Sequence, residues 1–285
     1  MVPMAEVISS AANPLIKRMR LLADRKHRRR EHAFVVHGVQ PVWQAVEAGA
    51  DIEALIVAPD LLTRPETAAM VARQEERGTR VVRVSAPLFA RLADRDGPSG
   101  LAAIVSAQPG SLSGLPVQPG SVFVALHEVG NPGNLGTIIR TASAAGGAGV
   151  ILIGQTTDPY DPAAVRASMG AVFSVPVAHA ASAEEFFGWA AGQGVGVAVT
   201  SARGTVSYWD SQLPRPGAIL LGSEGAGLPA GLLARGDLHV RIPMTGTAES
   251  LNLAVAAGIL LYEAWRQQGR GGPDVAQAPG SGLGT

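Results

Sequence analysis

The sequence has 285 residues, of which 47% are hydrophobic, 16% charged and 5% aromatic. This composition excludes a disordered chain, which would carry more charge and fewer apolar residues, and it suffices for one large domain or two ordinary ones. The 23 basic and 23 acidic side chains cancel, and the absence of cysteine excludes disulfides, thiolate metal sites and a cysteine nucleophile.

The sequence contains neither a membrane span nor a secretory signal. The most apolar helical stretch, residues 251–261, is shorter than the about 20 residues that cross a bilayer. The N-terminus has no apolar segment ahead of a small-residue cleavage site. We therefore expect a cytoplasmic protein without a membrane partner.

The first predicted element is a basic helix over residues 14–29. Residues 1–32 carry a net charge of +5, against −5 for the rest of the chain. The cluster consists of Lys17, Arg18, Arg20, Arg25, Lys26, Arg28, Arg29 and Arg30. It can be a solvated helix face or a polyanion site, and its density favours contacts with phosphates.

Helices and strands are predicted to alternate through residue 107, which indicates a small α/β sandwich. Strands are expected at 34–37, 54–58, 80–84 and 101–106, and helices at 39–48, 65–77 and 87–93. Residues 108–120 contain no charge and are rich in Pro and Gly, so they are predicted to be a linker between 1–107 and the next block.

Residues 121–268 form a second alternating block. Strands are expected at 121–126, 149–153, 195–200, 218–221 and 238–242, and helices at 134–144, 162–168, 183–191 and 250–267. The strands are continuously apolar, as parallel strands covered on both faces must be. The Gly- and Pro-rich tail, 269–285, is predicted to be disordered.

Three polar loops, 127–140, 221–229 and 242–252, follow strands of the second block. In sheets of this kind, ligands bind at the carboxyl ends of the strands. No glycine-rich dinucleotide fingerprint or phosphate-binding lysine loop is present, which disfavours a Rossmann oxidoreductase or an ATP enzyme. The three loops together therefore predict a site of another kind.

Each loop contributes polar side chains to this predicted site. Asn134 and Ser250 are interpreted as helix N-caps, and Arg140 follows within the helix that Asn134 opens. Glu224 is the only charge in its glycine-rich loop, and Asn252 lies at the start of the last helix. Each residue alone could serve an ordinary turn or cap.

The segments NPGNLGTIIRTA, LLGSEGAGL and IPMTGTAESLNLAVA resemble, in order and spacing, the three motifs of the SpoU-type (TrmH-family) RNA ribose methyltransferases. The first block resembles the small ribosomal-protein-like RNA-binding domain of the family's ribosomal members. Those that confer thiostrepton or avilamycin resistance are similar in length and layout. One departure is Asn131, where many members have Asp.

The resemblance implies an α/β fold with a C-terminal SPOUT domain, in which a parallel sheet is tied into a deep trefoil knot. A small ribosomal-protein-like α/β RNA-binding domain would precede it. The resemblance also implies S-adenosylmethionine as cofactor, a homodimer with sites at its interface, and no metal. Backbone at Gly222, Ile242 and Leu251 would hold the adenosine, and Thr200 and Ser201 would line the same pocket.

The implied reaction is methyl transfer to a ribose 2′-hydroxyl, with large-subunit ribosomal RNA as the expected substrate and antibiotic resistance as one role. Arg140 matches the family's proposed base, but a guanidinium stays protonated in proteins. It could remove the proton, or clamp the adjacent phosphate and polarise the hydroxyl. Asn134, Glu224, Ser250 and Asn252 would orient Arg140 and the cofactor.

RNA contacts are expected from the basic cluster and from one arginine of the second block. The residues are Lys17, Arg18, Arg28, Arg29, Arg30 and Arg166, the last of which could instead form a structural ion pair. Two other functions stay open. The chain could methylate transfer RNA, or it could be a non-catalytic RNA-binding or ribosome-assembly factor.

Overall fold

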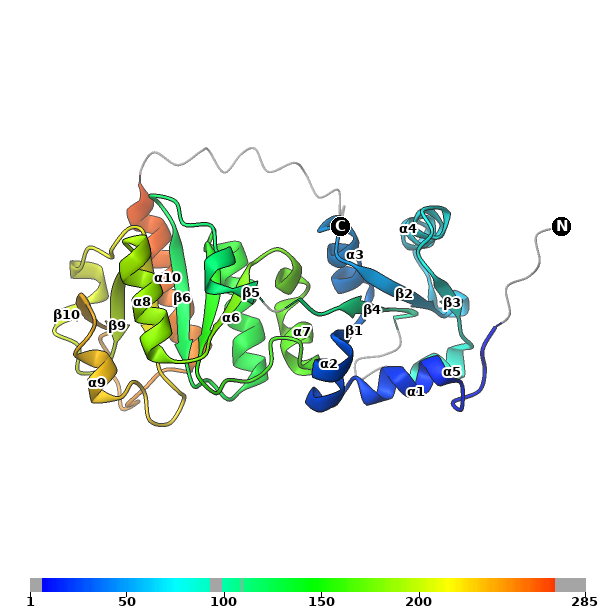
Figure 1. Cartoon of the computed structure of the whole chain (residues 1–285), viewed down its shortest axis with the longest axis horizontal. Coiled ribbons are helices and arrows are strands. Elements are labelled where there is room, and N and C mark those ends of the chain that lie inside the picture. The colour runs from blue at the N-terminus through cyan, green and yellow to red at the C-terminus, as the bar shows by residue number, and fades with distance from the viewer. Residues whose placement is uncertain (1–6, 93–98, 109, 270–285) are drawn as a thin grey trace.

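The computed structural model describes residues 7–92, 99–108 and 110–269, and the predicted tail lies outside them apart from Gly269. The chain forms two lobes, each built around one sheet (Figure 1). The N-terminal lobe has a four-stranded sheet and the C-terminal lobe an eight-stranded sheet. Within the described residues, no helix is long and apolar enough to span a membrane.

The N-terminal lobe is a three-layered α/β sandwich, as predicted. Its sheet has the order β1-β4-β2-β3 and comprises β1 (Ala33–His37), β2 (Ile52–Val57), β3 (Val81–Arg83) and β4 (Leu101–Ser106). Strand β4 is antiparallel to β1 and β2, whereas β2 and β3 are parallel. One face is covered by α1 (Pro14–Leu21) and α5 (Ala86–Ala90), the other by α3 (Val39–Glu47) and α4 (Pro65–Glu76).

The basic segment forms two helices, so the prediction of one continuous helix was wrong. Helix α1 ends at Leu21, and α2 (Arg25–Glu31) begins after Asp24. The Asp24 carboxylate accepts a hydrogen bond from the N–H of Lys26 at 2.7 Å. This cap competes with continuation of the first helix, because a short acidic side chain satisfies the free N–H groups of a new helix start.

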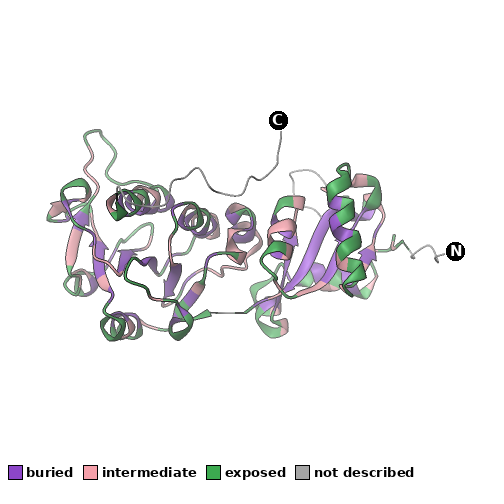
Figure 2. Ribbon diagram, turned by 90° about the horizontal axis from the view of Figure 1, so that it is seen from above, coloured by how far each residue is buried: buried purple, intermediate pink, exposed green. Residues whose placement is uncertain are grey.

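The C-terminal sheet has the order β10-β12-β9-β11-β6-β7-β8-β5, and every neighbouring pair is parallel. Its strands are β5 (Gly110–Ser111), β6 (Val122–His127), β7 (Gly149–Ile153), β8 (Val177–Ala180), β9 (Gly196–Thr200), β10 (Val206–Ser207), β11 (Gly217–Leu221) and β12 (Leu238–Arg241). Buried residues concentrate in the central strands (Figure 2), as their apolar runs predicted. Strands β5, β8 and β10 were not predicted from the sequence, because each is only two to four residues long.

Helices cover both faces of this sheet. Helices α6 (Pro132–Ala144) and α10 (Leu253–Gln268) pack on one face, and α8 (Ala183–Gln193) and α9 (Ala230–Leu233) on the other. Helix α7 (Pro162–Ser168) packs closely against α6. Short 3-10 helices are η1 (Pro59–Leu61), η2 (Leu112–Gly114), η3 (Ala171–Phe173) and η4 (Tyr208–Asp210).

Part of the predicted linker belongs to the C-terminal sheet. Gly110 and Ser111 form β5, which pairs with β8, and Leu112 and Leu115 are buried in the core beneath α8. The two leucines explain this packing, because they cover apolar surface at the sheet edge. The domain boundaries 1–107 and 121–268 stay a prediction.

The topology places a switch point at the carboxyl ends of β6 and β11. Strand β6 lies between β7 and β11, so the connections on its two sides run in opposite directions across the sheet. After β12, near one edge, the chain returns to α10, which packs on α6, β6 and β11. The trefoil knot expected along this path stays a prediction.

Candidate active site

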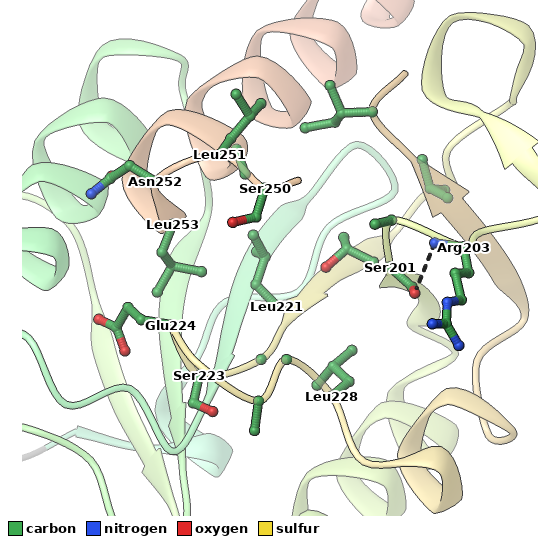
Figure 3. A pocket seen from close by; sticks show the side chains of 18 of the residues that line it. Ser201, Arg203, Leu221, Ser223, Glu224, Leu228, Ser250, Leu251, Asn252 and Leu253 are labelled. Carbon is green, nitrogen blue, oxygen red and sulfur yellow. Dashed lines mark hydrogen bonds between the residues drawn. The ribbon is translucent and has the colours of Figure 1, made fainter. Parts of the chain in front are cut away.

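The loops that follow β9, β11 and β12 surround one cavity of about 670 Å³ at the carboxyl ends of these strands, next to the switch point (Figure 3). Small-molecule sites of proteins span about 300–1,000 Å³, and open α/β sheets bind ligands at this position. The cavity is lined chiefly by residues 200–203, 221–228 and 250–253, with Ile242 and Met244.

All five residues predicted to bind the cofactor line this cavity: Thr200, Ser201, Gly222, Ile242 and Leu251. The Thr200 hydroxyl donates to the Leu220 carbonyl at 3.1 Å, and the Ser201 hydroxyl accepts from the backbone N–H of Arg203 at 3.2 Å. These bonds shape the end of β9 into one wall of the cavity.

Gly222 is needed because the loop after β11 folds tightly back on itself. A Cβ atom at this position would lie 2.1 Å from the carbonyl carbon of Gly227. No side chain can replace the glycine without moving the loop, because real Cβ atoms do not approach backbone this closely. The glycine therefore allows the loop to close on itself where it lines the cavity.

A chain of hydrogen bonds joins the three motif loops. The Asn134 side-chain amide donates to Glu224 Oε1 at 3.1 Å, and the Asn252 amide donates to Asn134 Oδ1 at 3.0 Å. The three residues lie on the first turn of α6, in the loop after β11 and immediately before α10. The sequence grouped these residues by motif, and the structure brings them into contact.

The loop environment keeps the Glu224 carboxylate ionised. Burial raises its pKa, but hydrogen bonds from Asn134 and from the backbone N–H groups of Glu224, Gly130 and Asn131 outweigh burial, so that the net shift is downward. The N–H groups of Gly130 and Asn131 lie 3.4 and 3.3 Å from the carboxylate oxygens. Glu224 therefore holds the β6 loop and the β11 loop together.

Both predicted helix caps are corrected by the structure. Asn131 caps α6, since its Oδ1 accepts from the N–H of Asn134 at 3.0 Å, and Asn134 lies inside the first turn. The sequence reading missed Asn131, although its place before Pro132 is typical of an N-cap followed by proline at the first helical position.

The second correction concerns the start of α10. Asn252 caps this helix, because its Oδ1 accepts from the N–H groups of Ala254 and Val255 at 2.9 and 3.3 Å. Ser250 is therefore not a cap. It lies two residues earlier and lines the cavity (Figure 3).

Arg140 lies apart from this hydrogen-bonded chain. It is exposed on the third turn of α6 and does not line the cavity. Among the described residues, its guanidinium makes no hydrogen bond or ion pair. Asn134, Glu224 and Asn252 make no direct hydrogen bond to Arg140 in the described part of the single chain, because positions 134 and 140 point to different sides of the helix. That these residues and Ser250 orient Arg140 and the cofactor stays a prediction.

The structure separates the predicted RNA contacts into exposed and structural residues. Lys17 and Arg29 are exposed, as is Arg166 on α7. Arg18 bridges Glu31 at 2.8 Å and Glu53 at 2.6 Å, which ties α1 to the sheet.

Arg30 is exposed and bonds to Glu31 at 3.0 Å. Arg28 is only 3% exposed, and its guanidinium pairs with Asp158 at 2.8 Å. A guanidinium that is buried and bonded through Nε, Nη1 and Nη2 is closed to a phosphate, so Arg28 is not an RNA contact in this structure. Within the described residues, no cluster of three or more His, Asp or Glu could hold a metal.

The fold and the motif loops define a SPOUT-type methyltransferase domain, which follows a substrate-binding domain in the chain. The SpoU rRNA Methylase family model matches residues 121–262, and the MRM3-like substrate binding domain matches residues 13–103. The chain belongs to the SpoU rRNA methylase family.

Among its relatives, the 23S rRNA (uridine(2479)-2′-O)-methyltransferase of Streptomyces viridochromogenes is 35% identical over 87% of this chain and 88% of its own length. The 23S rRNA (guanosine(2553)-2′-O)-methyltransferase RlmP of Bacillus subtilis is 30% identical over 90% of this chain and 97% of its own.

Solved structures share the whole architecture. The AdoMet-bound rRNA methyltransferase from Sinorhizobium meliloti superposes with a TM-score of 0.84 at 38% identity, covering 92% of this chain and 98% of that one. The SpoU methyltransferase AviRb from Streptomyces viridochromogenes, in complex with AdoMet, gives a TM-score of 0.80 at 31% identity, covering 90% and 98%. These likenesses extend over both lobes.

Proposed function

We propose that this protein transfers a methyl group from S-adenosylmethionine to a ribose 2′-hydroxyl of 23S ribosomal RNA. One observation carries the proposal: the motif loops 221–229 and 242–252 line one cavity, and the Glu224–Asn134–Asn252 chain joins the first motif loop to both of them. The names of the two relatives support the substrate and the reaction. A ribosomal substrate is consistent with a cytoplasmic enzyme.

The cavity suits a charged nucleoside such as S-adenosylmethionine. Leu221, Leu228 and Leu251 offer apolar surface for an adenine ring, and the loop after β11 exposes its backbone polar groups. Among the described residues, Glu224 is the only acidic side chain that lines the cavity, and its lowered pKa keeps it negative beside a cationic ligand. When bound, the cofactor supplies an electrophilic methyl group on a sulfonium.

Arg140 acts on the RNA in this proposal. The 2′-hydroxyl is a weak nucleophile, and a guanidinium offers five donors that can hold the neighbouring phosphate and polarise the hydroxyl. Arg140 is exposed and, among the described residues, unbonded, so these donors are available. We assign it the role of clamp rather than base, because a guanidinium does not give up its proton.

A second copy of this chain would complete the site. Val255, Tyr262 and Trp265 form a stripe along α10 and are 51%, 47% and 49% exposed, which is unusual for large apolar side chains on one helix. Helix α10 packs against α6, which carries Arg140. We infer that the stripe pairs two protomers, and that Arg140 reaches the partner's cavity because it does not line its own.

The exposed basic residues of the N-terminal lobe would bind the RNA backbone. Lys17, Arg29 and Arg30 lie on the lobe that matches a substrate-binding domain, and Arg166 adds a contact from α7. Phosphate contacts of this kind position the RNA, while the cavity selects the ribose.

Calorimetry with S-adenosylmethionine and transfer of labelled methyl groups test the proposal together. We expect cofactor binding in the absence of RNA and methyl transfer into 23S rRNA but not into transfer RNA. A chain that binds RNA without the cofactor would be the non-catalytic factor, and methylation confined to transfer RNA would correct the substrate. A role in antibiotic resistance is tested by drug susceptibility of cells with and without the gene.

A further inference from the structure

The two lobes meet through a buried ion pair that the proposed mechanism does not use. Arg28 of α2 donates from Nε to Asp158 Oδ2 at 2.8 Å, and its second amino group lies 2.8 Å from the same oxygen and 3.6 Å from Asp161. Figure 1 shows α2 and β1 beside α7 at this joint. Arg28 and Asp158 are 130 residues apart in sequence, so the contact links the lobes themselves.

Both sides of this ion pair are fixed by their own backbone. On the N-terminal side, Arg28 Nη1 donates to the carbonyls of Leu22 and Ala23 at 3.1 and 2.7 Å, in the break between α1 and α2. The guanidinium therefore bonds to the carbonyls of the helix break and to a carboxylate of the opposite lobe at the same time. Its planar fork makes this arrangement directional, which an ammonium could not reproduce.

On the C-terminal side, each carboxylate divides its oxygens between two tasks. Asp158 Oδ1 accepts from the N–H of Tyr160, and Asp161 Oδ1 caps α7 by accepting from Ala163, both at 2.9 Å. The Oδ2 atoms of both residues are left for Arg28. The acceptors are thus held in place before the arginine binds them.

Apolar contacts surround this ion pair. Val165 of α7 is buried within the hydrophobic core of the N-terminal lobe, and Phe34 of β1 packs on Tyr160 and Phe173 with ring centroids 4.6 and 6.0 Å apart. A Cβ atom on Gly170 would lie 2.7 Å from the Gln44 side chain, so the lobes approach closely here as well. The joint is packed like a protein interior and differs from a flexible tether.

We propose that Arg28 is a positioning residue of the methyl-transfer reaction. It holds the N-terminal lobe in one orientation relative to the cavity, so that RNA bound to that lobe presents its ribose to Arg140 and the cofactor. The inference rests on the proposed function. Orientation matters for rate because a misplacement of about 1 Å, even from a residue far from the chemistry, can cost 10²-fold.

The informative variant is Arg28→Met/Asp158→Asn. Arg28→Met alone leaves a buried carboxylate without its partner and can unfold the joint, whereas the double variant removes both charges. The matched control is Arg83→Met, which breaks an exposed ion pair with Glu75 inside the N-terminal lobe, away from the joint. Thermal unfolding of all variants shows whether each one is folded.

Two readouts separate positioning from a structural role. The first is the split between kcat and RNA affinity, measured with saturating cofactor. The second is the distance between spin labels on Ala72→Cys of α4 and Ala191→Cys of α8, two exposed positions in a chain without native cysteine. Labelled protein is diluted with unlabelled protein, so that only distances within one chain are observed.

We expect the folded double variant to lose roughly 10- to 100-fold in kcat while RNA and cofactor affinities stay within about threefold. Its label distances should broaden, whereas Arg83→Met should match the parent in both readouts. Parent-like kcat and label distances would overturn the proposal, and so would a loss confined to RNA affinity, which would make Arg28 an RNA contact. A parent that binds no S-adenosylmethionine would refute the proposed function, while the label distances would still test the joint.

Discussion

The three-loop cavity and the basic N-terminal segment were both recognised from sequence, but the structure treats them differently. At the cavity, residues of two motifs form the lining, and Asn134 of the third motif contacts Glu224 and Asn252 from beside it. In the basic segment, neighbouring arginines have unrelated environments: Arg28 is buried at the lobe joint while Arg29 is exposed. The order of the motifs therefore predicted which residues contact one another in the structure. The density of charge in the basic segment did not predict which arginines are exposed.

Replacing Arg140 should produce the largest effect of any single change at the site. We expect Arg140→Ala to lower kcat by at least about 10²-fold, as loss of one charge-stabilising donor commonly does. Cofactor affinity measured by calorimetry should not change, because the proposed contacts of Arg140 are with the RNA and not with the cofactor. Activity within tenfold of the parent would remove Arg140 from the mechanism.

Disrupting the α10 stripe should abolish activity by separating the protomers. We expect Tyr262→Asp/Trp265→Asp to elute at the monomer mass and to lose methyl transfer, since each buried charge is costly at an interface. Leu21→Asp, a change of an exposed leucine on α1, is the matched control and should stay dimeric. A fully active monomer would contradict a shared site.

Breaking the polar chain should have an intermediate effect that depends on pH. Glu224→Gln and Asn252→Ala each leave a polar partner unpaired; because these hydrogen bonds are exposed, we expect a cost to cofactor binding of about 1 kcal/mol, the net contribution of a typical hydrogen bond. Because the folded pKa of Glu224 is lowered, its contribution to stability is complete above the ordinary carboxyl pKa and is lost as pH falls through the folded pKa.

Denaturant unfolding of the parent and of Glu224→Gln over a range of pH measures this contribution. The difference in unfolding free energy between the two should be constant near neutral pH and should shrink in acid. A difference that grows as pH falls would show that Glu224 is protonated in the folded state at neutral pH.

The exposed arginines should show the smallest effect, confined to RNA affinity. Arg29→Ala should weaken RNA binding several-fold and flatten the slope of log affinity against log salt by about 0.7, the value for one single-strand phosphate contact. The cofactor affinity should stay the same, because the cavity lies in the other lobe. An unchanged salt slope would show that Arg29 belongs to a solvated helix face.

The sequence allowed most of the cavity to be predicted, because its residues lie in motifs with a fixed order along a parallel sheet. It did not allow the helix caps to be assigned, since Asn131 and Asn134, or Ser250 and Asn252, are equally good caps by residue type. Joining the loops does not distinguish them either, since Asn134 joins the loops without being a cap and Asn252 does both. The burial of Arg28 could not be predicted, because its partners are 130 residues away.

Direct mapping of 2′-O-methyl groups in 23S rRNA tests the central claim most directly. Unmodified 23S rRNA would be incubated with S-adenosylmethionine and either the parent protein or Arg140→Ala, and each nucleotide examined for ribose methylation. We expect one 2′-O-methylated nucleotide with the parent and none with the variant. A methyl group on a base, or equal ribose methylation by both proteins, would contradict the account.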